Sequence, residues 1–130
     1  MPGLVVLHGI NQLLNEFKKM DITEYERFNA IYTKGIGFLG CTMSHLEILK
    51  LAKKRNYKNI LIFEDDFQFL VSKEVFEDNL NKFFIEFPNF DICMLSYNLI
   101  SGMELSSSVV NKVLEAQTTA GYIVNNHYYD

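Results

Sequence analysis

Short apolar runs alternate along the chain with segments in which apolar residues recur every three or four positions. The apolar runs predict buried strands at residues 4–7, 60–63, 91–97 and, in its second half, 115–124. The longer periodicity predicts helices over residues 11–20, 41–55 and 72–87. Asn11 and Ser72 are suitable N-caps, and Pro88 stops the third helix. This alternation predicts an α/β domain with a mainly parallel central sheet flanked by helices.

The segments between these elements have their own signals. Residues 25–32 read as a further extended segment, and residues 34–40 hold three glycines in an apolar loop. Residues 99–109 are polar and predict an irregular loop. Within the second helix the inner stripe is expected to be Leu46, Leu49 and Ala52. The basic end of that helix is either a solvated face that complements the helix dipole or a patch for an anionic partner; it comprises Lys53, Lys54 and Arg55.

Length and composition narrow the class of protein. The 130 residues make a single domain, 1–130, and 48% hydrophobic content is enough for a packed core. A net charge of -4 argues against nucleic-acid binding, which needs a basic face. The N-terminus has neither a basic signal-peptide start nor an apolar run that could span a membrane, so we expect a cytoplasmic protein. Cys41 and Cys93 form no metal-binding or disulfide pattern, and both are expected to be buried, reduced thiols.

Three consecutive acids follow the buried run 60–63. Glu64, Asp65 and Asp66 stand where this strand reaches the surface, and ligands bind at the carboxyl ends of strands in open α/β sheets. Adjacent carboxylates repel one another, so a divalent cation with oxygen ligands, Mg²⁺ or Mn²⁺, fits there. The simpler interpretation is a solvated acidic turn.

Ser44 and His45 are expected in the first turn of the helix that starts at residue 41. Free backbone N–H groups and the helix dipole favour an anion at that point. The alternative is that Ser44 satisfies backbone groups of the helix end and that His45 is a packed, hydrogen-bonded histidine.

Several of these segments together resemble glycosyltransferase family 25, which includes lipooligosaccharide and collagen galactosyltransferases. The resemblance rests on G-C-x-x-S-H at residues 40–45, on the strand and acids at 62–66, and on T-T-A-x-Y-I-V at 118–124. Residues 25–30, YERFNA, are similar to an arginine-phenylalanine-x-alanine stretch of the family. The order and spacing agree over most of the chain.

The resemblance implies a GT-A fold and a function in glycan or lipopolysaccharide biosynthesis. A hexose, galactose or glucose, would pass from UDP-galactose or UDP-glucose to a glycan or protein acceptor, with inversion and with Mn²⁺ or Mg²⁺. By the same resemblance Asp66 is a metal ligand, and Glu64 and Asp65 share contacts with the metal and the ribose. Ser44 and His45 would lie near the diphosphate or the donor sugar.

The chain also departs from the family pattern. Residues 4–10 stand where the family has an asparagine-leucine pair followed by arginines, and residues 125–130 stand where it continues into a helix. The domain is therefore expected to be short at both ends and incomplete, with an exposed edge that could pair in a homo-oligomer. No general base is assigned, because Asp91 and Glu115 are more simply strand-start residues.

Two other classes compete with an active enzyme. An inactive module could keep the fold and bind a partner without catalysis. A signalling receiver domain also has paired acids after its first strand, but residues 91–97 lack the phosphoacceptor aspartate in the position that such a domain needs.

Overall fold

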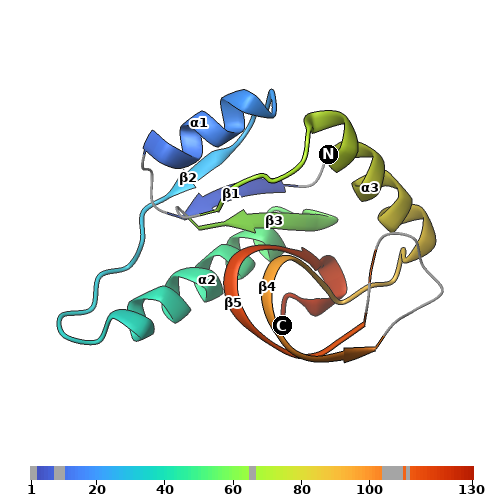
Figure 1. Ribbon diagram of the computed structural model, residues 1–130. Helices are drawn as coiled ribbons and strands as arrows, with labels where there is room; N and C mark the ends of the chain where they lie inside the picture. The colour runs from blue at the N-terminus through green and yellow to red at the C-terminus, as the bar shows by residue number, and fades with distance from the viewer. Residues whose placement is uncertain (1–2, 8–10, 65–66, 104–109, 111) are drawn as a thin grey trace.

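The computed structural model describes residues 3–7, 11–64, 67–103, 110 and 112–130. In chain order the elements are β1 (Gly3–Leu7), α1 (Asn11–Lys19), β2 (Glu26–Phe28), α2 (Gly37–Lys54), β3 (Asn59–Phe63), α3 (Lys73–Glu86), β4 (Ile92–Met103), β5 (Lys112–Asn125) and the 3₁₀ turn η1 (Asn126–Tyr128). The strands form one sheet in the order β2-β1-β3-β5-β4, and the β4–β5 ribbon curls strongly (Figure 1).

The predicted mainly parallel sheet of a GT-A-like domain is wrong. β1 runs parallel to β2 and β3, whereas β5 is antiparallel to both β3 and β4. The antiparallel half contains the two longest strands. The physical reason is the short connection at residues 104–111, since a parallel pairing needs a crossover of about a dozen residues or more. β4 and β5 therefore pair directly with each other.

The expected loop at residues 99–109 is also wrong in its first part, because β4 continues to Met103. The pairing of β4 with β5 shifts register at several points between Met94 and Gly102. Such bulges accommodate polar and glycine residues within a strand, which explains why the sequence pattern looked irregular. The extended segment expected at 25–32 is regular strand over Glu26–Phe28 alone.

Two apolar clusters lie on the opposite faces of β3. Leu61 and Phe63 pack with Phe17 of α1, and Phe76, Leu80 and Phe84 of α3 pack against the same cluster. Ile60 and Ile62 pack with Ile48 and Ala52 of α2 on the other face. Alternation of side chains along a strand accounts for this division, and it decides which residues face α2 near the end of β3.

α2 begins at Gly37, four residues before its predicted start, and ends at Lys54. Its buried residues are Gly40, Ser44, Ile48 and Ala52, so the predicted inner stripe is wrong at Leu46, which is about half exposed. The buried positions recur every four residues, and the first two are the small residues Gly40 and Ser44. These small residues let the first half of α2 approach the segment before it closely.

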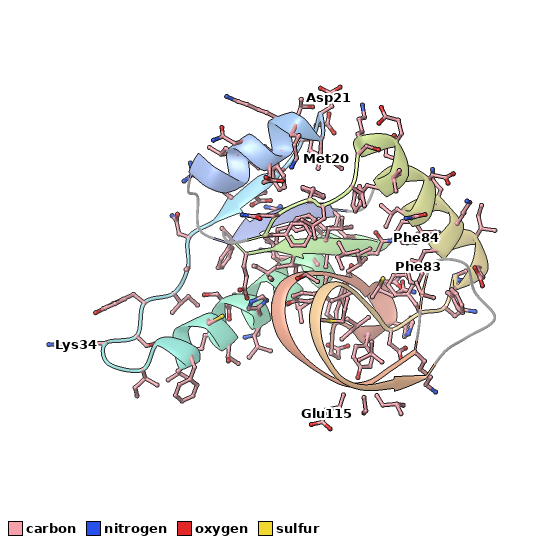
Figure 2. All side chains as sticks on the ribbon, in the orientation of Figure 1. Met20, Asp21, Lys34, Phe83, Phe84 and Glu115 are labelled. Carbon is pink, nitrogen blue, oxygen red and sulfur yellow. The ribbon has the colours of Figure 1, made fainter. Side chains whose placement is uncertain are left out.

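The predicted limits of α3 are confirmed within one residue. The Ser72 hydroxyl accepts a hydrogen bond from the Val75 backbone N–H, and the helix ends before Pro88. Figure 2 shows Phe83 and Phe84 on α3, and Phe83 is buried. Because both rings pack against Phe90, α3 is joined by aromatic contacts to the segment that enters β4.

Glu16 ties α1 to the segment after the acidic triplet. Its carboxylate accepts hydrogen bonds from the Phe69 backbone N–H at 2.8 Å and from the Lys19 ammonium at 2.9 Å. The bond from Lys19, and then that from Phe69, lowers the pKa of the Glu16 carboxyl group. A lowered pKa means that folding is favoured most when this carboxyl group is ionised.

We expect Glu16→Gln to lower the free energy of unfolding by about 1 kcal/mol at neutral pH. A carboxyl group with a lowered folded-state pKa contributes stability above its unfolded pKa, and this contribution is lost as pH falls through the folded value. The difference between the two proteins should therefore shrink below about pH 4. Urea unfolding of both proteins at a series of pH values measures this difference in the free energy of unfolding. Glu47→Gln is the control, because Glu47 pairs with Lys50 at the same spacing but is exposed. A difference that is constant across pH would contradict the assignment.

Candidate functional site

Glu64 faces α2 because it continues the alternation of β3. Ile62 faces α2 and Phe63 faces the opposite cluster, so the next side chain returns to the α2 side. The backbone supports this placement, since the Glu64 N–H donates to the Ala120 carbonyl at 2.8 Å and thereby extends the pairing of β3 with β5. The carboxylate thus emerges from a sheet position that is fixed by its neighbours.

α2 supplies two side chains to the same place. Cys41 and His45 are four residues apart and therefore lie on one face of the helix. His45 Nε2 lies 2.9 Å from Glu64 Oε1, and Cys41 Sγ lies 3.9 Å from the same oxygen. The His45 side chain is 12% exposed and that of Glu64 is 24% exposed, so solvent reaches the pair but does not surround it.

β5 supplies Tyr122, which completes a chain of three polar groups. Its hydroxyl lies 2.5 Å from His45 Nδ1, and the two rings stack with their centroids 5.5 Å apart. Because the Glu64 carboxylate can only accept, Nε2 of His45 carries a hydrogen and donates to it. A neutral His45 ring then uses Nδ1 to accept from the Tyr122 hydroxyl, which fixes both the tautomer and the orientation of the ring.

The local environment keeps the flanking groups neutral. Burial, with the charge of Glu64 as a smaller cause, raises the pKa of the Tyr122 hydroxyl. Partial burial first, and then the charge and hydrogen bond of Glu64, raise the pKa of the Cys41 thiol. Cys41 and Tyr122 therefore keep their protons at neutral pH and can act as hydrogen-bond donors.

Gly121, the residue before Tyr122, leaves space for an aromatic ring beside β5. In β5 it is opposite Phe63, and a Cβ atom there would lie 2.4 Å from the Phe67 ring. Phe67 follows the acidic triplet, and its N–H donates to the Glu64 carbonyl at 3.2 Å. The missing side chain at Gly121 thus makes room for the Phe67 ring.

The predicted site residues lie as follows. His45 and Glu64 are in direct contact, whereas Asp65 and Asp66 are outside the described residues. Ser44 is fully buried: its hydroxyl donates to the Gly40 carbonyl at 2.7 Å and accepts from the Ile31 N–H at 2.8 Å.

The expectation that Ser44 and His45 occupy the first turn of a helix is wrong. α2 starts at Gly37, so both residues lie about two turns inside it, where backbone N–H groups are already bonded. Ser44 and His45 therefore lack the free helix-end N–H groups that would bind an anion. Their positions follow instead from the contacts just described.

Sequence reasoning missed two members of the cluster. Cys41 was expected to be buried but is exposed, whereas Cys93 is half-buried. Burial raises the pKa of the Cys93 thiol to about 11. Both thiols are free. Tyr122 was noted only as part of the motif at residues 118–124, and no role was predicted for it. The signal for Tyr122 was the strand alternation that sets it on the α2 side with Val124.

Three motif segments thus converge on one point: the helix with Cys41 and His45, the strand end with Glu64, and the strand with Tyr122. The sequence matches glycosyltransferase family 25 (LPS biosynthesis protein) over residues 35–128, well over half of the chain. The protein is therefore a glycosyltransferase by class, and it belongs to family 25. The match spans every residue of the cluster.

No curated protein matches the chain closely enough to count as a relative. Within the part of the chain that the structure describes, none of the helices combines the length and the apolar character needed to cross a bilayer. The resemblance noted at residues 25–30 lies before the matched range.

Proposed function

We propose that this protein transfers a hexose, galactose or glucose, from a UDP-sugar to a glycan or protein acceptor with inversion. The observation that carries the proposal is the convergence of Cys41, His45, Glu64 and Tyr122 at the strand end that Asp65 and Asp66 follow. Family membership supports glycosyl transfer in general. The choice of a UDP-hexose donor is our inference from the resemblance of the acidic triplet to a nucleotide-sugar motif.

Transfer from a nucleotide sugar leaves negative charge on the departing diphosphate. We propose that Asp66, with Glu64, holds Mn²⁺ or Mg²⁺, since carboxylate oxygens are the ligands that these ions prefer. Such an ion acts as a Lewis acid toward the leaving group. Asp65 would share the contacts to the metal and the ribose.

The residues of the described cluster have supporting parts in this scheme. His45 fixes one oxygen of Glu64, and Tyr122 fixes the His45 ring, so the carboxylate is held in one orientation before a donor arrives. Preorganised groups of this kind cost no reorganisation during the reaction. Ser44, fully buried, contributes by tying Ile31 to α2, and we assign the ligand-facing position to His45.

A second function is an inactive binding module that retains the fold. The observation in its favour is that neither Asp91 nor Glu115 meets the cluster. Asp91 pairs with His127 at 2.7 Å, and Figure 2 shows Glu115 on the outer side of the curled ribbon. Within the described residues no acid other than Glu64 contacts His45. Binding without turnover separates the module from the enzyme.

Calorimetric titration of UDP into the full chain, with and without Mn²⁺, tests the donor site. We expect binding that requires the metal and that falls at least about tenfold in Asp66→Ala, because the substitution removes a proposed ligand. Asp78→Ala is the control: Asp78 is an exposed acid on α3 that pairs with Lys82, and its loss should leave UDP affinity unchanged. Equal, metal-independent binding in all three proteins would overturn the proposed role of the acids.

A further inference from the structure

We propose that Cys41, His45 and Glu64 form a binding site for a thiophilic divalent cation, Zn²⁺ by preference. This site shares Glu64 with the oxygen-ligand site assigned to Asp66, but it adds a sulfur and a nitrogen ligand. It does not depend on the donor or on turnover. The ligand atoms are Cys41 Sγ, His45 Nε2 and a Glu64 carboxylate oxygen, and all three lie within 4.8 Å of one another.

The distances are close to those of a bound ion. Zn²⁺ bonds of about 2.0 to 2.3 Å in a tetrahedral site place two ligand atoms about 3.5 Å apart. The separation from Glu64 Oε1 is 2.9 Å to His45 Nε2 and 3.9 Å to Cys41 Sγ. Side-chain adjustments of about 1 Å would therefore close the site around an ion. Cys41 is exposed, which provides a route for the ion and an open fourth position for water.

The surroundings of His45 also suit a ligand. Metal-bound histidines usually donate their other ring N–H to a fixed acceptor, which sets the tautomer. Tyr122 Oη already lies against Nδ1 and its ring stacks on that of His45. When the ion replaces the hydrogen on Nε2, Nδ1 carries the hydrogen and donates to Tyr122 Oη. The same contact therefore supports both the empty and the bound arrangement.

The mixture of ligands selects the ion. Metal binding displaces the proton of the Cys41 thiol into solvent, as it does at thiolate sites in general. Thiolate and imidazole favour Zn²⁺, whereas Mg²⁺ and Mn²⁺ prefer oxygen ligands throughout. Two of the three ligands come from one helix face at a spacing of four residues, and the third comes from a strand end that is held by backbone hydrogen bonds. The site is therefore built on regular structure, which favours a defined geometry.

Co²⁺ substitution tests this proposal without any need for activity. The full chain, reduced and free of metal, is titrated with Co²⁺ while thiolate-to-cobalt charge transfer and the ligand-field bands are recorded. We expect one ion per chain, a charge-transfer band, and displacement of Co²⁺ by Zn²⁺ but not by Mg²⁺. Cys41→Ser should abolish the charge-transfer band, and His45→Gln should weaken Co²⁺ binding at least about tenfold.

Two variants serve as controls. Cys93→Ser removes the other thiol, and Asp66→Ala removes the proposed Mn²⁺ ligand; both should keep the charge-transfer band. Circular dichroism of each variant reports whether it is folded. A band that persists in folded Cys41→Ser, or the absence of any band in the wild type, would overturn the zinc site. Since UDP is not in the assay, this failure is distinct from a failure of the proposed donor site.

Discussion

Gly40→Ala should lower the free energy of unfolding by about 2–3 kcal/mol. A Cβ atom at residue 40 would lie 2.3 Å from the Ile31 carbonyl oxygen, which is backbone and cannot rotate away. The segment around Ile31 would have to move, and with it the bond from the Ile31 N–H to the buried Ser44 hydroxyl. The loss should outweigh the better helix propensity of alanine, which is worth about 1 kcal/mol.

Gly37→Ala is the matched control on the same helix. A Cβ atom at residue 37 meets nothing within 4 Å, so this substitution should be neutral or should stabilise by up to about 1 kcal/mol. Urea unfolding of the two variants measures the difference directly. Equal stability of Gly40→Ala and Gly37→Ala would show that the close approach of α2 to residue 31 does not constrain the fold.

Glu64→Gln should lower kcat/KM for transfer from a UDP-hexose by about 100-fold or more. The amide removes the negative charge that we assign to metal and donor binding, but its oxygen can still accept a hydrogen bond from His45 Nε2. The fold should therefore be preserved while the chemistry is lost. Steady-state measurement of UDP release in the presence of Mn²⁺ and an acceptor glycan gives the two constants.

Tyr122→Phe should cost less, about tenfold in kcat/KM, because Tyr122 acts through the orientation of His45. Glu47→Gln, an exposed carboxylate on the same helix as His45, should retain full activity. A Tyr122→Phe loss as large as that of Glu64→Gln would contradict a positioning role. Full activity in Glu64→Gln would show that the cluster has no role in the reaction.

The parts of the fold that follow from local patterns could be predicted. The β3 run and the Ser72 cap of α3 are determined by neighbouring residues, and both lie where the pattern places them. Strand direction could not be predicted in this way, since β5 lies between β3 and β4 by long-range pairing. The start of α2 was also missed, because glycines usually indicate a loop, whereas Gly40 serves close packing inside the helix.

The candidate site also combines features that local sequence patterns predict with features that depend on long-range strand pairing. The spacing of Cys41 and His45 is visible in the sequence, and so is the strand end before Glu64. Their contact with Tyr122 depends on the register in which Tyr122 of β5 is opposite Ile62. The sequence pattern does not reveal this register of β5 against β3. The contacts that join Tyr122, His45 and Glu64 could therefore be found only from the structure.

UDP release by the wild-type chain from UDP-galactose and from UDP-glucose, with and without Mn²⁺, tests the proposed transfer most directly. We expect metal-dependent release from at least one donor, faster in the presence of an acceptor glycan. Metal-dependent binding of UDP with no release from either donor would contradict it, and would identify the protein as a binding module that retains the family's fold.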